Sequence, residues 1–120
     1  RLTLVETAIS GDPSFFLGTD SAPHPTHAKY GKDAKAGIFN AAYGLEVVAE
    51  IFATANKLDN LAAFTSVNGA TFYGYEPSQE TITLHRSSLD PEKATHISTE
   101  DGNQVVLFGV EEASQWTVST

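Results

Sequence analysis

The chain has 120 residues, a formal net charge of −8 and 41% hydrophobic residues. This length suits one domain, and the hydrophobic fraction is enough for a modest buried core, which excludes a disordered chain. The acidic balance argues against nucleic acid as a partner, because such binding needs a clustered basic surface. No stretch approaches the roughly 18 apolar residues of a membrane span, so we expect a soluble, cytoplasmic protein without a membrane partner.

The absence of cysteine and methionine limits the chemistry of the chain. Without cysteine, disulfides and thiolate metal sites are excluded, and any zinc would be bound by histidine and carboxylate side chains. Because the chain starts at Arg1 and has no methionine, we expect it to be a piece of a longer protein.

The first twenty residues predict one helix and one buried strand. Apolar residues at near-helical spacing indicate a helix that ends near residue 10, where Ser-Gly-Asp-Pro breaks it. Residues 15–17 are consecutively apolar, which is typical of a short parallel strand buried on both faces. The first half of the chain offers this strand no ladder partner, so its partners must come from upstream of Arg1 or from another chain. Asp20 follows the strand, at the end where ligands bind in α/β folds.

Residues 21–36 are predicted to form a long loop, and long loops without regular structure usually serve a function. Three of the seven lysines and arginines lie there, together with His27: they are Lys29, Lys32 and Lys35. An acidic chain with cations at this point is compatible with an anionic substrate. A solvated surface loop is the more common explanation of such a cluster.

Two helices are predicted after the loop. Asn40 is expected to cap the first, which runs to about residue 55. Its core face has four apolar residues at helical spacing, namely Leu45, Val48, Ala49 and Phe52. Asp59 is expected to cap the second helix, and Asn68-Gly69 to end it.

The chain beyond Pro77 predicts strands. Residues 81–84 and 115–118 alternate polar and apolar side chains, while residues 105–108 form a continuous apolar run. We therefore divide the chain into a first part, residues 1–75, and a small β-rich appendage, residues 76–120.

Asp20, His24 and His27 bring a carboxylate and two imidazoles within eight residues. This spacing fits metal ligands or an acid–base pair, although it also occurs in loops without a site. His85 and His96 have no carboxylate at useful spacing, so we expect them to face solvent or to serve the structure.

Three ordered motifs make residues 1–75 resemble the C-terminal third of a dihydroorotase, of the single-function type within the amidohydrolase superfamily. The motifs are FLGTDSAPH at residues 16–24, AGIFNA at 36–41 and FTSVNGATFYG at 64–74. The resemblance implies an α/β fold: the last strand and following helices of a (β/α)₈ TIM-type barrel, with a small β-rich tail. It also implies the reversible cyclisation of N-carbamoyl-L-aspartate to dihydroorotate, a step of pyrimidine biosynthesis that uses two zinc ions.

The resemblance also assigns roles to residues. Asp20 matches the aspartate that binds one zinc and acts as the proton shuttle. His24 and Ala36 match positions that bind the substrate carboxylate, Ala36 through its backbone. The other zinc ligands of the family precede the aspartate, so this chain needs the rest of its own barrel and we expect it to be inactive alone. The family commonly forms homodimers, and His27 and the three lysines match no family motif.

Two other functions remain open from the sequence. One is a related cyclic amidohydrolase acting on a hydantoin or allantoin-type ring, although the Ser-Ala-Pro-His turn suits a substrate with a carboxylate. The other is a non-catalytic dihydroorotase-like scaffold, which metal analysis of the intact protein would distinguish by near-zero zinc.

Overall fold

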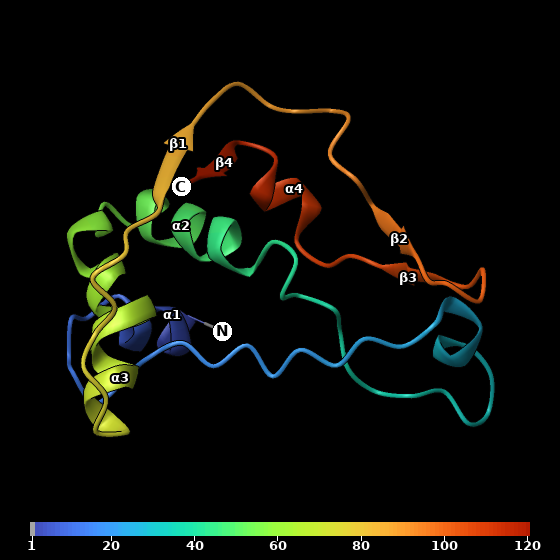
Figure 1. The fold of residues 1–120 in the computed structure, drawn as a ribbon, viewed down its shortest axis with the longest axis horizontal. Helices are drawn as coiled ribbons and strands as arrows, with labels where there is room; N and C mark the ends of the chain where they lie inside the picture. The colour runs from blue at the N-terminus through green and yellow to red at the C-terminus, as the bar shows by residue number, and fades with distance from the viewer. Residues whose placement is uncertain (1) are drawn as a thin grey trace.

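The computed structural model describes residues 2–120, and Figure 1 shows short helices and two short antiparallel sheets joined by long connections. The helices are α1 (Leu2–Ala8), α2 (Gly44–Thr54), α3 (Asn68–Phe72) and α4 (Val110–Ala113), with 3₁₀ turns at Thr26–Lys29 and Leu58–Asn60 and a π-helical turn at Ala63–Val67. The strands are β1 (Thr83–Arg86), β2 (His96–Ser98), β3 (Gln104–Val106) and β4 (Trp116–Ser119). Within residues 2–120, no helix is long and apolar enough to cross a membrane.

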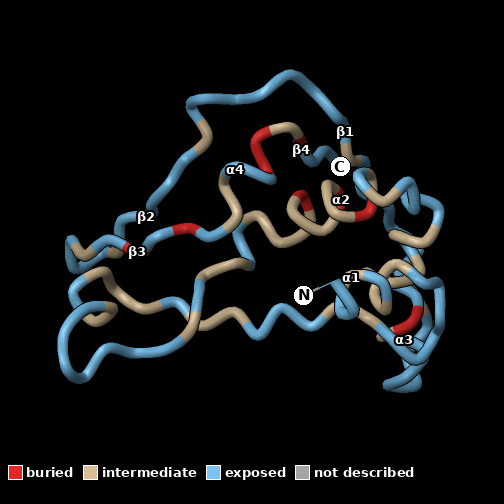
Figure 2. The backbone as a smooth tube through the Cα atoms, turned by 180° about the vertical axis from the view of Figure 1, so that it is seen from behind, coloured by how far each residue is buried: buried red, intermediate tan, exposed pale blue. Residues whose placement is uncertain are grey.

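Helix α2 carries the centre of the buried core (Figure 2). Ala49 and Phe52 are 0% and 1% exposed, and α4 and β4 pack on the same helix with Ala113 and Trp116 buried. The predicted core face is therefore confirmed at Ala49 and Phe52, whereas Leu45 and Val48 are only half-buried. The predicted cap is wrong, because Tyr43 precedes the helix without a side-chain cap and the Asn40 amide donates to Thr19 O instead.

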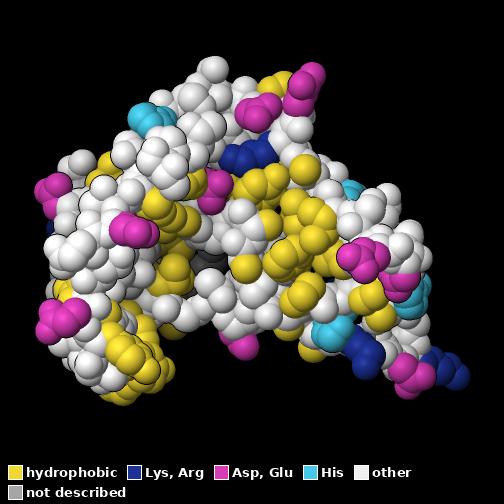
Figure 3. Space-filling view, in the orientation of Figure 1, with side chains coloured by type: hydrophobic (Ala, Val, Ile, Leu, Met, Phe, Trp, Pro, Cys, Tyr) yellow, Lys and Arg dark blue, Asp and Glu magenta, His cyan; other side chains and the backbone are white. Residues whose placement is uncertain are grey.

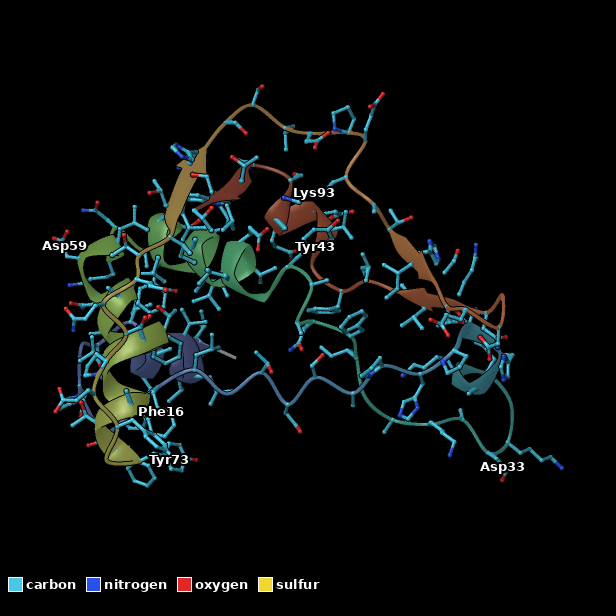
Figure 4. The ribbon with its side chains drawn as sticks, in the orientation of Figure 1. Phe16, Asp33, Tyr43, Asp59, Tyr73 and Lys93 are labelled. Atoms are coloured by element: carbon cyan, nitrogen blue, oxygen red, sulfur yellow. The ribbon has the colours of Figure 1, made fainter. Side chains whose placement is uncertain are left out.

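Two acidic residues one turn apart on α2 anchor the last third of the chain. Glu46 lies 3.8 Å from the Lys93 ammonium, and both side chains are nearly buried. Glu50 accepts a hydrogen bond from the Trp116 indole N–H at 2.8 Å, and it forms an ion pair with Arg86 at 3.1 Å. Lys93 also lies over the Tyr43 ring, as Figure 4 shows. These contacts attach Arg86, Lys93 and Trp116 to the helix that precedes them.

The strands form two separate pairs. Strand β1 runs antiparallel to β4, with Leu84 opposite Val118, and β2 runs antiparallel to β3, with Ile97 opposite Val105. The three predicted strand regions are confirmed at β1, β3 and β4, whereas β2 and helix α4 were missed. A single parallel bridge joins Phe39 to Leu107, which ties the second pair to the loop before α2.

The predicted strand at residues 15–17 is wrong for the described part of the chain. Phe15, Phe16 and Leu17 have no strand assignment, and the Leu17 N–H donates to Phe64 O at 2.9 Å. The physical reason is that a strand forms only where another strand completes its ladder of hydrogen bonds. Residues 2–120 supply no such neighbour, so this segment runs along the helices instead (Figure 1).

The predicted helix end at Asn68-Gly69 is also wrong, because the helix continues through α3 to Phe72. Asn68 is only 8% exposed, and its side-chain amide donates to Phe15 O at 3.0 Å. A Cβ on Gly69 would lie 3.1 Å from the Phe16 ring, so glycine lets that ring approach the helix. Tertiary contacts therefore outweigh the turn-forming preference of the two residues.

Candidate functional site

Asp20 lies in a constrained stretch of backbone. Its φ of +46° falls in the left-handed region, which aspartate and asparagine tolerate better than most other residues. The side chain is exposed, and within residues 2–120 its carboxylate has no hydrogen bond or ion pair. A free carboxylate on a fixed backbone can bind a cation or accept a proton.

The residues on both sides of Asp20 are tied to the segment before α2. The Asn40 amide donates to Thr19 O at 2.8 Å, and the Ala41 N–H donates to the Ser21 hydroxyl oxygen at 3.2 Å. The Ala22 N–H donates to Ile38 O at 2.8 Å. Residues 19–22 and 38–41 therefore lie side by side, which brings two of the sequence motifs together.

His24 lies in a different environment from Asp20. It is half-buried and lines a cavity of about 240 Å³, which Lys29, Tyr30, Gly37 and residues 105–108 also line. Asp20 does not line this cavity. Within the described residues, the aspartate and the histidine of the motif thus lie on one connected loop but do not share one pocket.

Ala36 is exposed and lies between two residues whose carbonyls Lys29 holds. The Lys29 ammonium donates to Lys35 O at 3.0 Å and to Gly37 O, the two carbonyls that flank Ala36. The 3₁₀ turn that carries Lys29 is attached to β3 by a hydrogen bond from the Thr26 hydroxyl to Gln104 O, at 2.9 Å. The acceptors of Lys29 are backbone atoms, so no sequence motif reveals its role.

The other histidines do not join this region. His27 is exposed, His85 pairs with the Ser119 hydroxyl at 2.9 Å, and His96 pairs with the Thr95 hydroxyl at 2.8 Å. Among residues 2–120, no group of three or more His, Asp or Glu side chains is arranged to bind a metal. Asp20 can therefore provide one ligand of a metal site, and further ligands would have to come from elsewhere.

Two carboxyl groups with perturbed pKa values lie in turns outside the site. The pKa of Asp12 is lowered from its usual 3.8 because the backbone N–H and then the hydroxyl of Ser14 bond to the carboxylate. The pKa of Asp101 is lowered by the Thr99 hydroxyl and then by Asn103. Hydrogen bonds of this kind are typical of Asx turns, so neither group marks a functional site.

Comparison with known proteins gives a consistent set of relatives, although no family model matches the chain. A dihydroorotase of Ruegeria pomeroyi is 52% identical over 91 residues, which cover 76% of this chain and 26% of the relative. A dihydroorotase of Sinorhizobium medicae is 44% identical over 118 residues, covering 98% of this chain and 34% of the relative. The chain thus spans about a third of these proteins, or less.

Solved structures agree with the sequence relatives. A dihydroorotase of Saccharomyces cerevisiae, in complex with 5-fluoroorotic acid, superposes with a TM-score of 0.85 at 30% identity, over 98% of this chain and 33% of that one. A dihydroorotase of Campylobacter jejuni gives a TM-score of 0.74 at 30% identity, over 99% of this chain and 34% of that one.

Proposed function

Because this chain is homologous to the C-terminal portion of dihydroorotases, we propose that it forms that part of a zinc-dependent dihydroorotase. The reaction is the reversible cyclisation of N-carbamoyl-L-aspartate to dihydroorotate. The observation that carries the proposal is the superposition over 98% of the chain on an enzyme that binds 5-fluoroorotic acid, a pyrimidine carboxylate. The resemblance of the three motifs supports the same assignment.

The proposal gives Asp20 two roles. Its carboxylate is exposed and unpaired within residues 2–120, while Asn40 and Ala41 hold the neighbouring residues Thr19 and Ser21, so it fits one ligand position of a zinc site. Zinc, when bound, supplies Lewis-acid polarisation of the ring amide and a lowered pKa for the attacking water. Asp20 then accepts the proton of that water and returns it to the departing ring nitrogen. A serine or asparagine at this position could not move the proton.

The substrate carboxylate is assigned to His24 and Ala36. His24 is half-buried in the cavity beside Lys29, and an imidazole can donate a hydrogen bond to a carboxylate. Within the described residues the Ala36 N–H has no hydrogen-bond partner, so it is free to bind an anion.

The proposal also covers the arrangement of the whole protein. Residues 1–75 end a (β/α)₈ barrel whose remaining strands complete the ladder for residues 15–17, and residues 76–120 form its appendage. Two zinc ions per site and a homodimer complete the proposed enzyme. Most zinc ligands then lie in the part of the barrel that precedes Asp20.

The test is turnover of dihydroorotate by the full-length protein and its Asp20→Ala variant. We expect the wild-type enzyme to be active and to lose activity to chelators. Removing the proton shuttle alone lowers kcat by about 10²- to 10⁴-fold, and the lost zinc ligand adds to that loss. Asp33→Ala is the control, because Asp33 lies on the same loop but at its outer end (Figure 4). Normal turnover by Asp20→Ala would refute the proposal.

A further inference from the structure

Lys29 makes contacts that a solvated surface lysine does not make. It is half-buried at the end of the 3₁₀ turn Thr26–Lys29, and its ammonium donates to the carbonyls of Lys35 and Gly37. Its neighbours in the loop, Lys32 and Lys35, are exposed. Of the three lysines in this loop, Lys29 is thus the one whose side chain supports the backbone.

The two carbonyls that Lys29 holds belong to the residues on either side of Ala36. Gly37 has a φ of +115°, and a Cβ there would lie 2.6 Å from the Ala22 Cβ, so the chain can turn at this point only with glycine. The Ala28 carbonyl also accepts a hydrogen bond from the Lys35 N–H at 2.9 Å. The carbonyls on both sides of Ala36 are therefore held by hydrogen bonds, whereas the Ala36 N–H has no partner within residues 2–120.

We propose that Lys29 is a positioning residue that holds the Ala36 N–H in place for an anionic carboxylate on the substrate. This inference rests on the proposed function, which assigns the substrate carboxylate to both Ala36 and His24. Lys29 and His24 line one cavity, so the lysine charge also lies beside the place where the anion would bind. An ammonium has three N–H donors, and the two backbone carbonyls use two of them.

The chain offers a matched control in Lys93. Its ammonium likewise donates to two backbone carbonyls, those of Ala113 and Trp116, at 2.8 and 2.7 Å. Lys93 lies against α2 and does not line the cavity of His24. Lys29→Met and Lys93→Met therefore remove the same kind of contact, but only the first removes it next to Ala36. Lys35→Met controls for the loss of one positive charge on the loop.

The experiment measures KM and kcat for dihydroorotate, and the Kd of orotate by calorimetry, in the full-length enzyme and these three variants. We expect Lys29→Met to raise both KM and the orotate Kd by about tenfold with kcat within about twofold, since it removes binding that substrate and transition state share. Lys93→Met should lower the melting temperature but leave KM and Kd unchanged. Lys35→Met should change neither by more than about twofold.

Three results distinguish a failure of the role inferred for Lys29 from a failure of the proposed function. If Lys29→Met binds orotate as well as Lys93→Met does, the role of Lys29 is refuted while the proposed function stands. If the wild-type enzyme neither binds orotate nor hydrolyses dihydroorotate, both are refuted. Should Lys29→Met fail to fold, Lys29→Gln decides the question: its amide can still donate to one carbonyl, and we expect its orotate Kd to be weaker than that of wild type. An unchanged Kd in Lys29→Gln would overturn the inference.

Discussion

Gly37 shows how a single residue determines the shape of the loop after Asp20. Its φ of +115° and the 2.6 Å approach of the Ala22 Cβ exclude any side chain without movement of the backbone. The hydrogen bond from the Ala22 N–H to Ile38 O holds the two segments at this distance. The loop between the Asp20 and Asn40 motifs therefore closes on itself at Gly37.

We predict that Gly37→Ala destabilises the protein by more than Gly31→Ala does. Both glycines have positive φ, and forcing alanine into that region costs on the order of 1–3 kcal/mol. A Cβ at Gly31 would lie in open space, so Gly31→Ala has only the backbone strain. A Cβ at Gly37 would also collide with the Ala22 Cβ. Urea unfolding of the full-length protein measures the difference, and equal losses would contradict this account of the bend.

At the same scale, the sequence alone reveals candidate residues whose signal is local. Asp20 and His24 stand out because their residue types and spacing are visible in the chain, and the left-handed φ of Asp20 is compatible with aspartate. The role of Lys29 cannot be predicted from the sequence, because its partners are two carbonyls six and eight residues away. A sequence shows that a lysine is present, but not which backbone atoms it reaches.

Among the elements, helix α2 can be predicted from the sequence, whereas the structure of residues 15–17 cannot. The apolar spacing of Ala49 and Phe52 suffices for a helix whatever its neighbours are. Residues 15–17 have an equally apolar pattern, yet a strand requires a partner, and no pattern within the chain supplies one. Asn68-Gly69 has the pattern of a helix end, and the sequence does not show that its contacts with Phe15 and Phe16 come from a segment more than fifty residues earlier.

We predict that Glu50→Ala loosens the attachment of β4 to α2. Trp116 is 4% exposed, and its indole N–H donates to Glu50 alone, so the variant leaves a buried donor unpaired at a cost of about 1–3 kcal/mol. Glu112→Ala is the control, because this exposed acid should change stability by less than about 0.5 kcal/mol. Equal unfolding midpoints for the two variants in denaturant would show that the Glu50 contact contributes nothing.

The surface of the whole molecule is consistent with a part of a larger barrel. Several large apolar side chains are mostly exposed, and Figure 3 shows hydrophobic groups gathered at one end of the molecule as well as near its middle. The most exposed are Leu2 (79%), Leu4 (76%), Tyr30 (73%), Tyr75 (73%), Phe72 (70%) and Tyr73 (66%). The Phe16 ring contacts the rings of Phe72 and Tyr73 at centroid distances of 5.2 and 5.9 Å, and those two rings lie 5.0 Å apart, so three aromatic rings form one cluster. Under the proposed function, the rest of the barrel covers it.

The most direct measurement is the position of zinc in crystals of the full-length protein, located by anomalous diffraction at the zinc edge. We predict a zinc ion about 2.0–2.2 Å from a carboxylate oxygen of Asp20, the usual distance for an aspartate ligand. A zinc-loaded enzyme in which Asp20 touches no metal, or a protein that holds no zinc at all, would contradict the account.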